Sequence, residues 1–271
     1  MKDRVAIEIS GGIADVKLIR ADKMNALDDR MFDALIEAGM TLAADAAIRC
    51  AVLSGEGRAF CAGIDLGRLG ATGSAAGDAI NKPAYRLAPR THGMTNRAQK
   101  AAWVWRELPV PVIAAVHGVA FGGGFQIMLG ADMRYVAPDT RLSVMEVKWG
   151  LAPDMAGTLL MRELARGDVI RELTYTGRIF SGEQALAWGF ATRVCENPHA
   201  VAMETAREIA ARSPSAIEAA KRIYNQTGAL SVADALLLES VEQDGIKGGA
   251  NQREAIASQM EKRPARFVNA R

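Results

Sequence analysis

VPVIAAVHGVAFGGGFQIMLGAD, residues 110–132, is the stretch that decides the fold of this chain. Its apolar run at 112–116 ends at His117-Gly118, glycines fill positions 122–124, and a helical apolar pattern begins at Phe125. This order predicts a buried strand, a tight turn and a helix. Glycine allows positive φ and close approach by another molecule, and the first N–H groups of a helix are free to bind an anion. The turn is therefore expected either to bind an oxyanion or phosphate or simply to pack closely. It is neither a G-x-G-x-x-G motif nor a P-loop.

A second copy of this pattern occurs earlier in the chain. A short apolar strand at 51–53 leads to A-F-C-A-G at 59–63, which parallels A-F-G-G-G at 120–124. In this alignment Ala62 lies opposite Gly123. Repeated units tend to stack, so one backbone N–H from each turn could meet at one oxygen. Ala62 and Gly123 are therefore predicted to form an oxyanion hole for a carbonyl that becomes an enolate or a tetrahedral centre.

The composition is that of an ordinary globular protein. The 271 residues are 49% hydrophobic and 24% charged, with a net charge of +2, which does not indicate a nucleic-acid partner. No apolar run approaches the roughly 20 residues that span a bilayer, and the first residues lack the apolar core of a signal peptide. Cys50, Cys61 and Cys195 are too few and too widely spaced for a disulfide framework or a zinc site. We expect a cytoplasmic protein without a metal or a membrane partner.

The rest of the sequence predicts an α/β core followed by helices. Residues 5–18 alternate as a β-hairpin does, and the pattern becomes wholly helical from Pro198 onward. We therefore expect a core at 1–197 and a helical C-terminal region at 198–271. Residues 70–96 predict a mobile lid or a disordered insertion. Asp28 and Ser181 are expected to cap helices, the first of which should bury Met31, Phe32, Leu35, Ile36 and Met40. Other helices are expected at 99–108 and 155–164.

Two carboxyl groups are candidates for proton transfer beside the predicted hole. Glu146 and Asp154 flank the turn at 148–151, among apolar neighbours. Burial there would raise a carboxyl pKa and make the group a usable acid or base near neutral pH. Asp154 could instead be only a helix N-cap, and Glu146 could simply pair with Lys148 or with a distant arginine.

Other reactive residues have weaker support. His117 ends a strand beside glycines and is expected to be structural, and Cys61 has the small apolar neighbours of a core residue. The chain contains no G-x-S-x-G, H-E-x-x-H or C-x-x-C motif, so neither a serine hydrolase nor a zinc enzyme is indicated.

Taken together, these motifs resemble the crotonase family, also called the enoyl-CoA hydratase/isomerase family. The likeness runs nearly end to end and is weakest over residues 70–100. It implies an α/β fold built as a spiral of ββα units, and a C-terminal helical region used for trimerisation, often as a dimer of trimers. The matching segments are KMNAL (23–27), GRAFCAGIDL (57–66), HGVAFGGG (117–124), AD (131–132), GRIFSGEQALAWGFATRV (177–194) and EKRPARF (261–267).

The resemblance implies an acyl-CoA thioester substrate, as in fatty acid metabolism, with coenzyme A as part of the substrate and no separate cofactor. The N–H groups of Ala62 and Gly123 would hold the thioester oxygen. Lys23 and Arg58 are candidate phosphate contacts, although either could be a solvated surface charge. The other expected substrate-binding residues are Ala59, Ile64, Asp65, Leu66 and Gln126.

Departures from the family pattern bear on the reaction. Family hydratases use two glutamates; here Glu146 occupies the second position, but Gln126 occupies the first, and an amide exchanges no proton at neutral pH. EVKWGLAPDMAGT (146–158) resembles the dienoyl-CoA isomerase branch, whose partner acid corresponds to Asp154, although that branch carries an aspartate at position 126.

The expected reaction is therefore a double-bond shift in an enoyl- or dienoyl-CoA. Glu146 would remove an allylic or vinylogous proton, Ala62 and Gly123 would hold the dienolate oxygen, and Asp154 would exchange a proton at the far end of the conjugated system. Gln126 would bind substrate or orient Glu146. The alternatives are a hydratase with Glu146 as the main acid/base and Gln126 positioning water, or a non-catalytic acyl-CoA binding protein.

Overall fold

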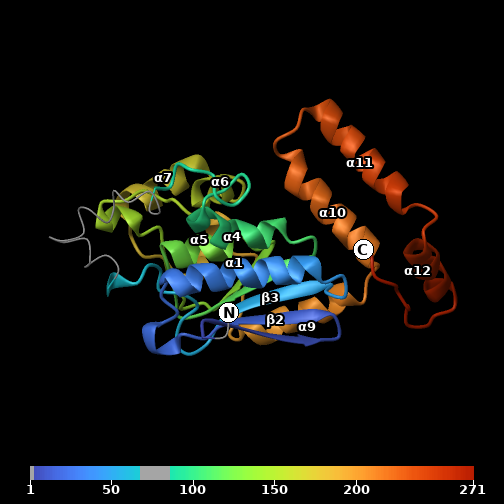
Figure 1. Cartoon of the computed structure of the whole chain (residues 1–271), viewed down its shortest axis with the longest axis horizontal. Helices are drawn as coiled ribbons and strands as arrows, with labels where there is room; N and C mark the ends of the chain where they lie inside the picture. Colours follow the sequence, from blue (N-terminus) through green and yellow to red (C-terminus); the bar gives the residue numbers. More distant parts are fainter. Residues whose placement is uncertain (1–2, 68–85) are drawn as a thin grey trace.

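A computed structural model of the chain describes residues 3–67 and 86–271. Within these residues, six strands form a sheet in the order β1-β2-β3-β4-β6-β8 (Figure 1). The predicted hairpin is confirmed, because β1 and β2 pair in antiparallel fashion, and the other strands join in parallel. The strands are β1 (Val5–Ser10), β2 (Ile13–Leu18), β3 (Cys50–Gly55), β4 (Val112–Val116), β6 (Met133–Val136) and β8 (Arg193–Val194).

A second layer of short pairings accompanies this sheet. Strands β5 (Val119–Phe121) and β7 (Arg141–Ser143) pair in parallel, and single bridges join Cys61 to Ala120, Leu27 to Ile64, and Leu142 to Phe180. Strand β4 is thus followed by β5 and then by helix α5 (Gly123–Leu129). The predicted strand, turn and helix at 110–132 are present, with the short strand β5 inserted between them.

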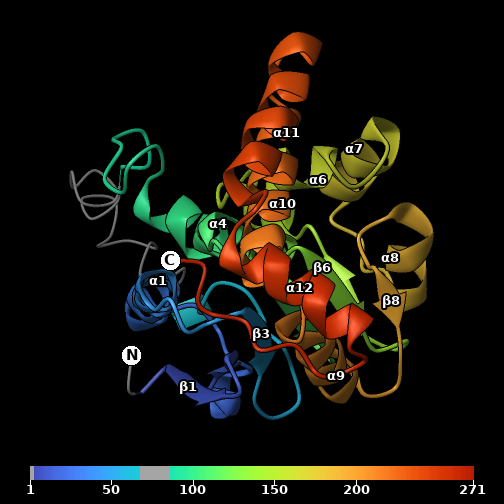
Figure 2. The same ribbon diagram turned by 90° about the vertical axis from the view of Figure 1, so that its right-hand side faces the viewer.

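Helices cover both faces of the large sheet (Figures 1 and 2). Helices α1 (Asp29–Ala44), α4 (Arg97–Glu107) and α5 pack into the main hydrophobic core. Helix α9 (Pro198–Ala210) covers the opposite face through Ala202 and Ala206. The remaining helices of this part are η1 (Ala21–Lys23), η3 (Glu146–Trp149), α6 (Gly157–Arg162), α7 (Gly167–Thr176) and α8 (Gly182–Trp188).

The two predicted helix caps are present, but one predicted core residue is not buried. Asp28 accepts a hydrogen bond from the Met31 N–H at 2.8 Å, and Ser181 caps α8 in a capping box completed by Gln184. Met40 is 58% exposed, which contradicts its assignment to the core. At 100° per residue it lies half a turn around α1 from Met31, on the side facing away from the sheet.

Three helices form an arm that projects from the body (Figures 1 and 2). They are α10 (Pro214–Thr227), α11 (Val232–Ile246) and α12 (Ala250–Met260). Lys221 anchors α10, donating to the Val110 carbonyl and to Asp132, each at 2.8 Å. Helix α11 has no buried residue among those described. Since α9 lies on the sheet, the projecting arm begins only after α9, and the division at residue 198 stays a prediction.

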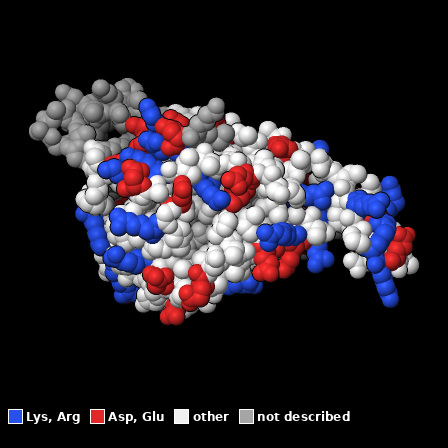
Figure 3. Space-filling view, turned by 90° about the horizontal axis from the view of Figure 1, so that it is seen from below, with Lys and Arg blue, Asp and Glu red and all other residues white. Residues whose placement is uncertain are grey.

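The surface carries charges of both signs. On the face seen in Figure 3, basic and acidic side chains are interspersed. In the described part of the chain, no helix combines the length and the apolar character needed to cross a membrane. The predicted irregular stretch at 70–96 lies, up to residue 85, outside the described residues.

The turn after β4 requires a glycine at position 118. Gly118 has φ +63°, and an added Cβ would lie 2.0 Å from the Arg58 carbonyl oxygen. Gly118→Ala should therefore lower the free energy of unfolding by about 2–4 kcal/mol, measured by urea denaturation. Gly11→Ala is the matched control, because Gly11 has φ +59° but nothing within 4 Å of the added Cβ. Equal losses in the two variants would contradict the steric argument.

Candidate active site

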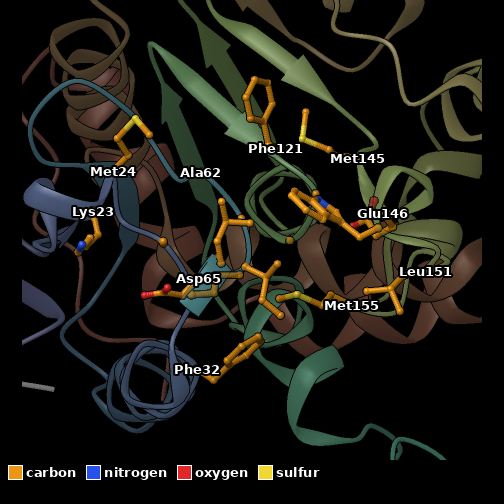
Figure 4. A pocket seen from close by; sticks show the side chains of 18 of the residues that line it. Lys23, Met24, Phe32, Ala62, Asp65, Phe121, Met145, Glu146, Leu151 and Met155 are labelled. Carbon is orange, nitrogen blue, oxygen red and sulfur yellow. The ribbon is translucent and has the colours of Figure 1, made fainter. Parts of the chain in front are cut away.

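A cavity of about 600 Å³ opens beside the two repeated turns. In Figure 4, Glu146 and Leu151 lie on one side of it, Lys23 and Asp65 on the other, and Met155 and Phe32 below. Its wall is mostly apolar, and both predicted carboxyl residues, Glu146 and Asp154, line it. The structure therefore brings together residues from segments that are far apart in the sequence.

The two A-F-x-x-G segments lie side by side, as the repeat predicts, but in a different register. Cys61 pairs with Ala120: the Cys61 N–H donates to Val119 at 3.0 Å, and the Phe121 N–H donates to Cys61 at 3.1 Å. The sequence alignment had placed Ala59, not Cys61, opposite Ala120. Counting onward in the observed register brings Ile64, rather than Ala62, level with Gly123.

The predicted role of Ala62 as an oxyanion donor is therefore wrong. The Ala62 N–H donates to the Met24 carbonyl at 2.9 Å, so it is already occupied. Ile64 bridges Leu27 through the backbone groups of its two neighbours, since the Leu27 N–H donates to Gly63 and the Asp65 N–H donates to Leu27. In a parallel bridge of this kind, the N–H of the central residue points away from the partner strand.

Two N–H groups remain for a ligand at this place. Among the described residues, the Ile64 N–H has no backbone or side-chain acceptor, and the N–H of Gly123, the first residue of α5, has no intrahelical acceptor. Gly63 makes their approach possible: it has φ +84°, and a Cβ there would lie 2.5 Å from the Phe121 carbonyl and 3.7 Å from the Gly123 nitrogen. Both Ile64 and Gly123 line the cavity.

Glu146 begins the short helix η3 and is buried, with 8% of its surface exposed. Its Oε1 accepts a hydrogen bond from the Gln126 amide at 2.5 Å. Its Oε2 is, within the described part of the chain, the one buried side-chain polar atom without a partner. Burial raises the pKa of Glu146, hydrogen bonds from nearby backbone N–H groups and from Gln126 oppose this shift, and the nearby Asp154 raises the pKa further. A raised pKa makes this carboxylate a stronger proton acceptor than an ordinary surface glutamate.

Gln126 is buried behind Glu146, with 1% of its surface exposed. Its side-chain oxygen accepts the N–H groups of Met155 and Gly157, each at 2.9 Å. It is not among the residues that line the cavity. The position of Gln126 therefore does not support the prediction that it binds substrate. The alternative prediction was contact with Glu146, and the structure shows that contact.

Asp154 lies on the exposed rim of the cavity. The helix that follows it begins at Gly157, and its N-cap position is Ala156, which has φ +67°. Asp154 is thus not the N-cap that the sequence also allowed. Its charge acts on Glu146, which places the two carboxyl groups at one site.

The residues predicted to bind the substrate divide into two groups. Lys23, Ile64, Asp65 and Leu66 line the cavity, although Asp65 is held by Arg20 at 2.7 Å. Ala59 does not line it: the residue is fully buried, and its carbonyl accepts a hydrogen bond from Asn25 at 2.9 Å. The prediction for Ala59 is therefore wrong, because the residue fixes the loop instead of facing the cavity. Arg58 is exposed but lies outside the cavity wall, and its phosphate contact stays a prediction.

The two weaker candidates have structural surroundings. The Cys61 thiol is fully buried, donates to the Asn25 carbonyl at 3.1 Å, and has its pKa raised by burial to about 12. His117 contacts the Gly57 carbonyl through Nε2 at 2.8 Å. Neither residue lines the cavity, as expected for groups that hold the two turns together.

Sequence reasoning missed three parts of the wall. Ile64 was predicted only to contact substrate, Phe121 was treated only as part of the repeated A-F-x-x-G motif, and Trp149 only as an apolar neighbour of the two carboxyl groups. All three line the cavity. Trp149 is 47% exposed. The positions of Phe121 and Trp149 beside Gly122 and Glu146 in the sequence were the available signal.

This arrangement can stabilise a negative oxygen and move a proton next to it. Open backbone N–H groups act on charge that develops during a reaction, and a buried carboxylate takes a proton from the neighbouring carbon. Low-polarity surroundings strengthen electrostatic interactions, and the wall of this cavity is mostly apolar.

Comparisons with known proteins agree with this chemistry. Residues 8–270 match the family described as "Enoyl-CoA hydratase/isomerase". A carnitinyl-CoA dehydratase of Salmonella typhi is 34% identical over 237 residues, covering 86% of this chain and 84% of the relative. The crystal structure of an enoyl-CoA hydratase from Mycobacterium marinum has a TM-score of 0.84 at 27% identity, covering 98% of each chain. One from Polaromonas sp. JS666 has a TM-score of 0.86 at 25% identity, covering 98% of this chain and all of the other.

These likenesses extend over nearly the whole chain. They confirm the α/β, crotonase-like fold expected from the sequence. They also agree with an acyl-CoA thioester as the substrate class. The protein therefore belongs to the enoyl-CoA hydratase/isomerase family.

Proposed function

We propose that the protein moves the double bond of an enoyl- or dienoyl-CoA through an enolate. The observation that carries this proposal is the buried Glu146, which lines the same cavity as Ile64 and Gly123. Among the described residues, its Oε2 has no hydrogen-bond partner, and the N–H groups of Ile64 and Gly123 have no acceptor. The thioester oxygen would accept both N–H groups. Glu146 would take a proton from a carbon conjugated with the carbonyl, and the oxyanion hole would hold the resulting charge.

Asp154 is the proposed partner for the second proton transfer. It lines the same cavity and is close enough to influence the charge of Glu146. Its exposed position at the rim allows proton exchange with solvent. In the forward reaction, Glu146 gains the proton that the substrate loses, and Asp154 returns one at the other end of the conjugated system. The double bond moves, and the composition of the substrate does not change.

Hydration or dehydration is the second candidate. Relatives named carnitinyl-CoA dehydratase favour it. In this chain, both lone pairs of the Gln126 carbonyl are used by the Met155 and Gly157 N–H groups. That oxygen therefore cannot position a water molecule, which is why we prefer double-bond migration.

Single-turnover ultraviolet spectroscopy separates the two reactions. The wild-type protein would be mixed with 3-enoyl-, 2-enoyl- and dienoyl-CoA esters, and the products would be identified by mass. Migration leaves the mass unchanged, whereas hydration adds one water. Asp154→Asn should slow migration and leave ester binding unchanged. Migration at the wild-type rate in this variant would remove Asp154 from the mechanism, and 3-hydroxyacyl-CoA as the main product would favour the second candidate.

The pH dependence follows from the surroundings of Glu146. The carboxyl must be ionised to accept a proton, and its pKa is raised above the ordinary value of 4.5, chiefly by burial. kcat/KM should therefore fall as the pH drops through this raised pKa, with a midpoint clearly above 4.5. A pH–rate profile measured with a poor substrate, for which proton transfer limits the rate, tests this. A rate that stays flat down to the ordinary carboxyl pKa would contradict it.

We also propose that the arm of α10–α12 packs against further copies of the chain, as a homotrimer or a dimer of trimers. Apolar side chains on α11 support this, since Leu236, Leu237 and Val241 are each about 60% exposed. The coenzyme A phosphates are expected to lie near Lys23 and Arg58. Light scattering of the purified protein would give its mass, and a monomer at micromolar concentration would contradict the assembly.

A further inference from the structure

The side-chain amide of Gln126 has a fixed orientation. Its oxygen accepts two backbone N–H groups, from Met155 and Gly157, and its nitrogen donates to Glu146. The flipped amide would place NH₂ against two N–H donors and the oxygen against a carboxylate, so it would lose all three hydrogen bonds. Gly157 contributes space, because a Cβ at that position would lie 2.5 Å from the Gln126 oxygen.

This network leaves the two oxygens of Glu146 unequal. Oε1 is occupied by the Gln126 amide, while Oε2 has no partner among the described residues. An added Cβ on Gly122 would lie 3.3 Å from Oε1, so this oxygen is also packed against the glycine turn that precedes α5. Only Oε2 is left to accept a proton from a substrate.

The same amide holds the segment that carries Asp154. Met155 and Gly157, on either side of the left-handed residue Ala156, both donate to Gln126. Met155 lines the cavity and lies against Gly123, since a Cβ there would be 2.8 Å from the Met155 sulfur. One buried side chain thus connects Glu146, the segment that carries Asp154, and, through Met155, Gly123 at the start of α5.

We propose that Gln126 is a positioning residue. It leaves one oxygen of Glu146 free to react, and it holds the segment that carries Asp154 in place relative to Glu146. This inference rests on the proposed function, because the position of Glu146 matters for catalysis only if Glu146 is the base. Because Gln126 does not line the cavity, its removal should act on kcat and on the titration of Glu146 more than on KM.

Two substitutions separate positioning from simple packing. Gln126→Leu keeps the volume but removes all three hydrogen bonds. Gln126→Glu keeps an oxygen that can accept the Met155 and Gly157 N–H groups, but it can donate to Glu146 only while the pair shares a proton. Two carboxylates at this separation cannot both ionise freely, so the singly protonated pair would mimic the native hydrogen bond.

The expected results differ between the two variants. Gln126→Leu should lower kcat about 100-fold, the size of effect that a misplacement of about 1 Å produces, with KM changed less than about threefold. The acid limb of the Gln126→Leu pH profile should move to higher pH, because one of the hydrogen-bond donors that lower the Glu146 pKa is gone. Gln126→Glu should retain activity at low pH and gain an alkaline limb where the shared proton leaves.

Gln99→Leu provides the matched control. Gln99 also accepts a backbone N–H with its side-chain oxygen, from Asn96 at 3.1 Å, in the capping box of α4. The control variant should lose some stability but keep the wild-type pH profile. A Gln126→Leu profile with the wild-type acid limb, or a Gln126→Glu profile without an alkaline limb, would overturn the proposal.

Infrared difference spectroscopy keeps this test independent of any reaction. The protonated Glu146 carboxyl should give a band that titrates with pH and is missing in Glu146→Gln. Its midpoint should rise in Gln126→Leu and stay in place in Gln99→Leu. An unchanged midpoint would overturn the positioning role even if the substrate proved different, whereas a shifted midpoint without isomerase activity would contradict the proposed function alone.

Discussion

Glu146→Gln is expected to lower kcat for double-bond migration by about 10³-fold, within the range that general acid–base catalysis supplies. The substitution keeps the shape of the side chain but replaces Oε2, the buried carboxylate oxygen that has no partner among the described residues. KM should change little, because the cavity wall and the two open N–H groups remain. Single-turnover spectroscopy with a 3-enoyl-CoA ester would measure the loss.

Glu163→Gln is a suitable control for this prediction. Glu163 pairs with Arg106 at 2.9 Å and lies outside the wall of the proposed active site. Its replacement removes a carboxylate from the protein without touching the reaction. If Glu146→Gln keeps more than about one tenth of the wild-type kcat, Glu146 is not the base.

Ile64→Pro is expected to lower kcat by about 10²–10³-fold, the usual effect of losing one oxyanion donor. Proline removes the backbone N–H that, among the described residues, donates to no acceptor. Ile64→Val keeps the N–H and an apolar side chain, so it should stay close to wild type. Circular dichroism would establish that both variants fold.

Binding measurements give this prediction a second readout. The wild-type protein should bind a CoA thioester more tightly than an S-alkyl-CoA of the same length, because only the thioester presents an oxygen to the two N–H groups. Ile64→Pro should reduce this preference without weakening the S-alkyl compound. A preference that survives the proline would mean that the oxygen is held elsewhere.

The sequence predicted the elements of the site better than their register. The strand at 112–116, the helix after the glycines and the pairing of the two A-F-x-x-G segments are all present. The sequence placed the oxyanion donor at Ala62, two residues before Ile64. The reason is that aligning the similar motifs put Ala62 opposite Gly123, whereas the backbone pairs Cys61 with Ala120. A repeat in sequence identifies which segments meet, but the hydrogen bonds of the pairing set which N–H remains free.

The sequence limited Gln126 to two roles, binding substrate or orienting Glu146, but could not decide between them. The position after the glycines indicated a residue next to the reaction, and contact with Glu146 was one of two expectations. The amide acceptors come from residues 155 and 157, in a turn whose path depends on the left-handed residue Ala156. Nothing in the local sequence predicts such a backbone conformation for an alanine.

A crystal structure with a bound, unreactive enoyl-CoA analogue tests the central claim most directly. The thioester oxygen should lie about 2.7–3.1 Å from the nitrogens of both Ile64 and Gly123, with Glu146 Oε2 facing the carbon that loses its proton. An oxygen bound away from these two nitrogens, or an acyl chain that leaves Glu146 Oε2 without contact, would contradict it.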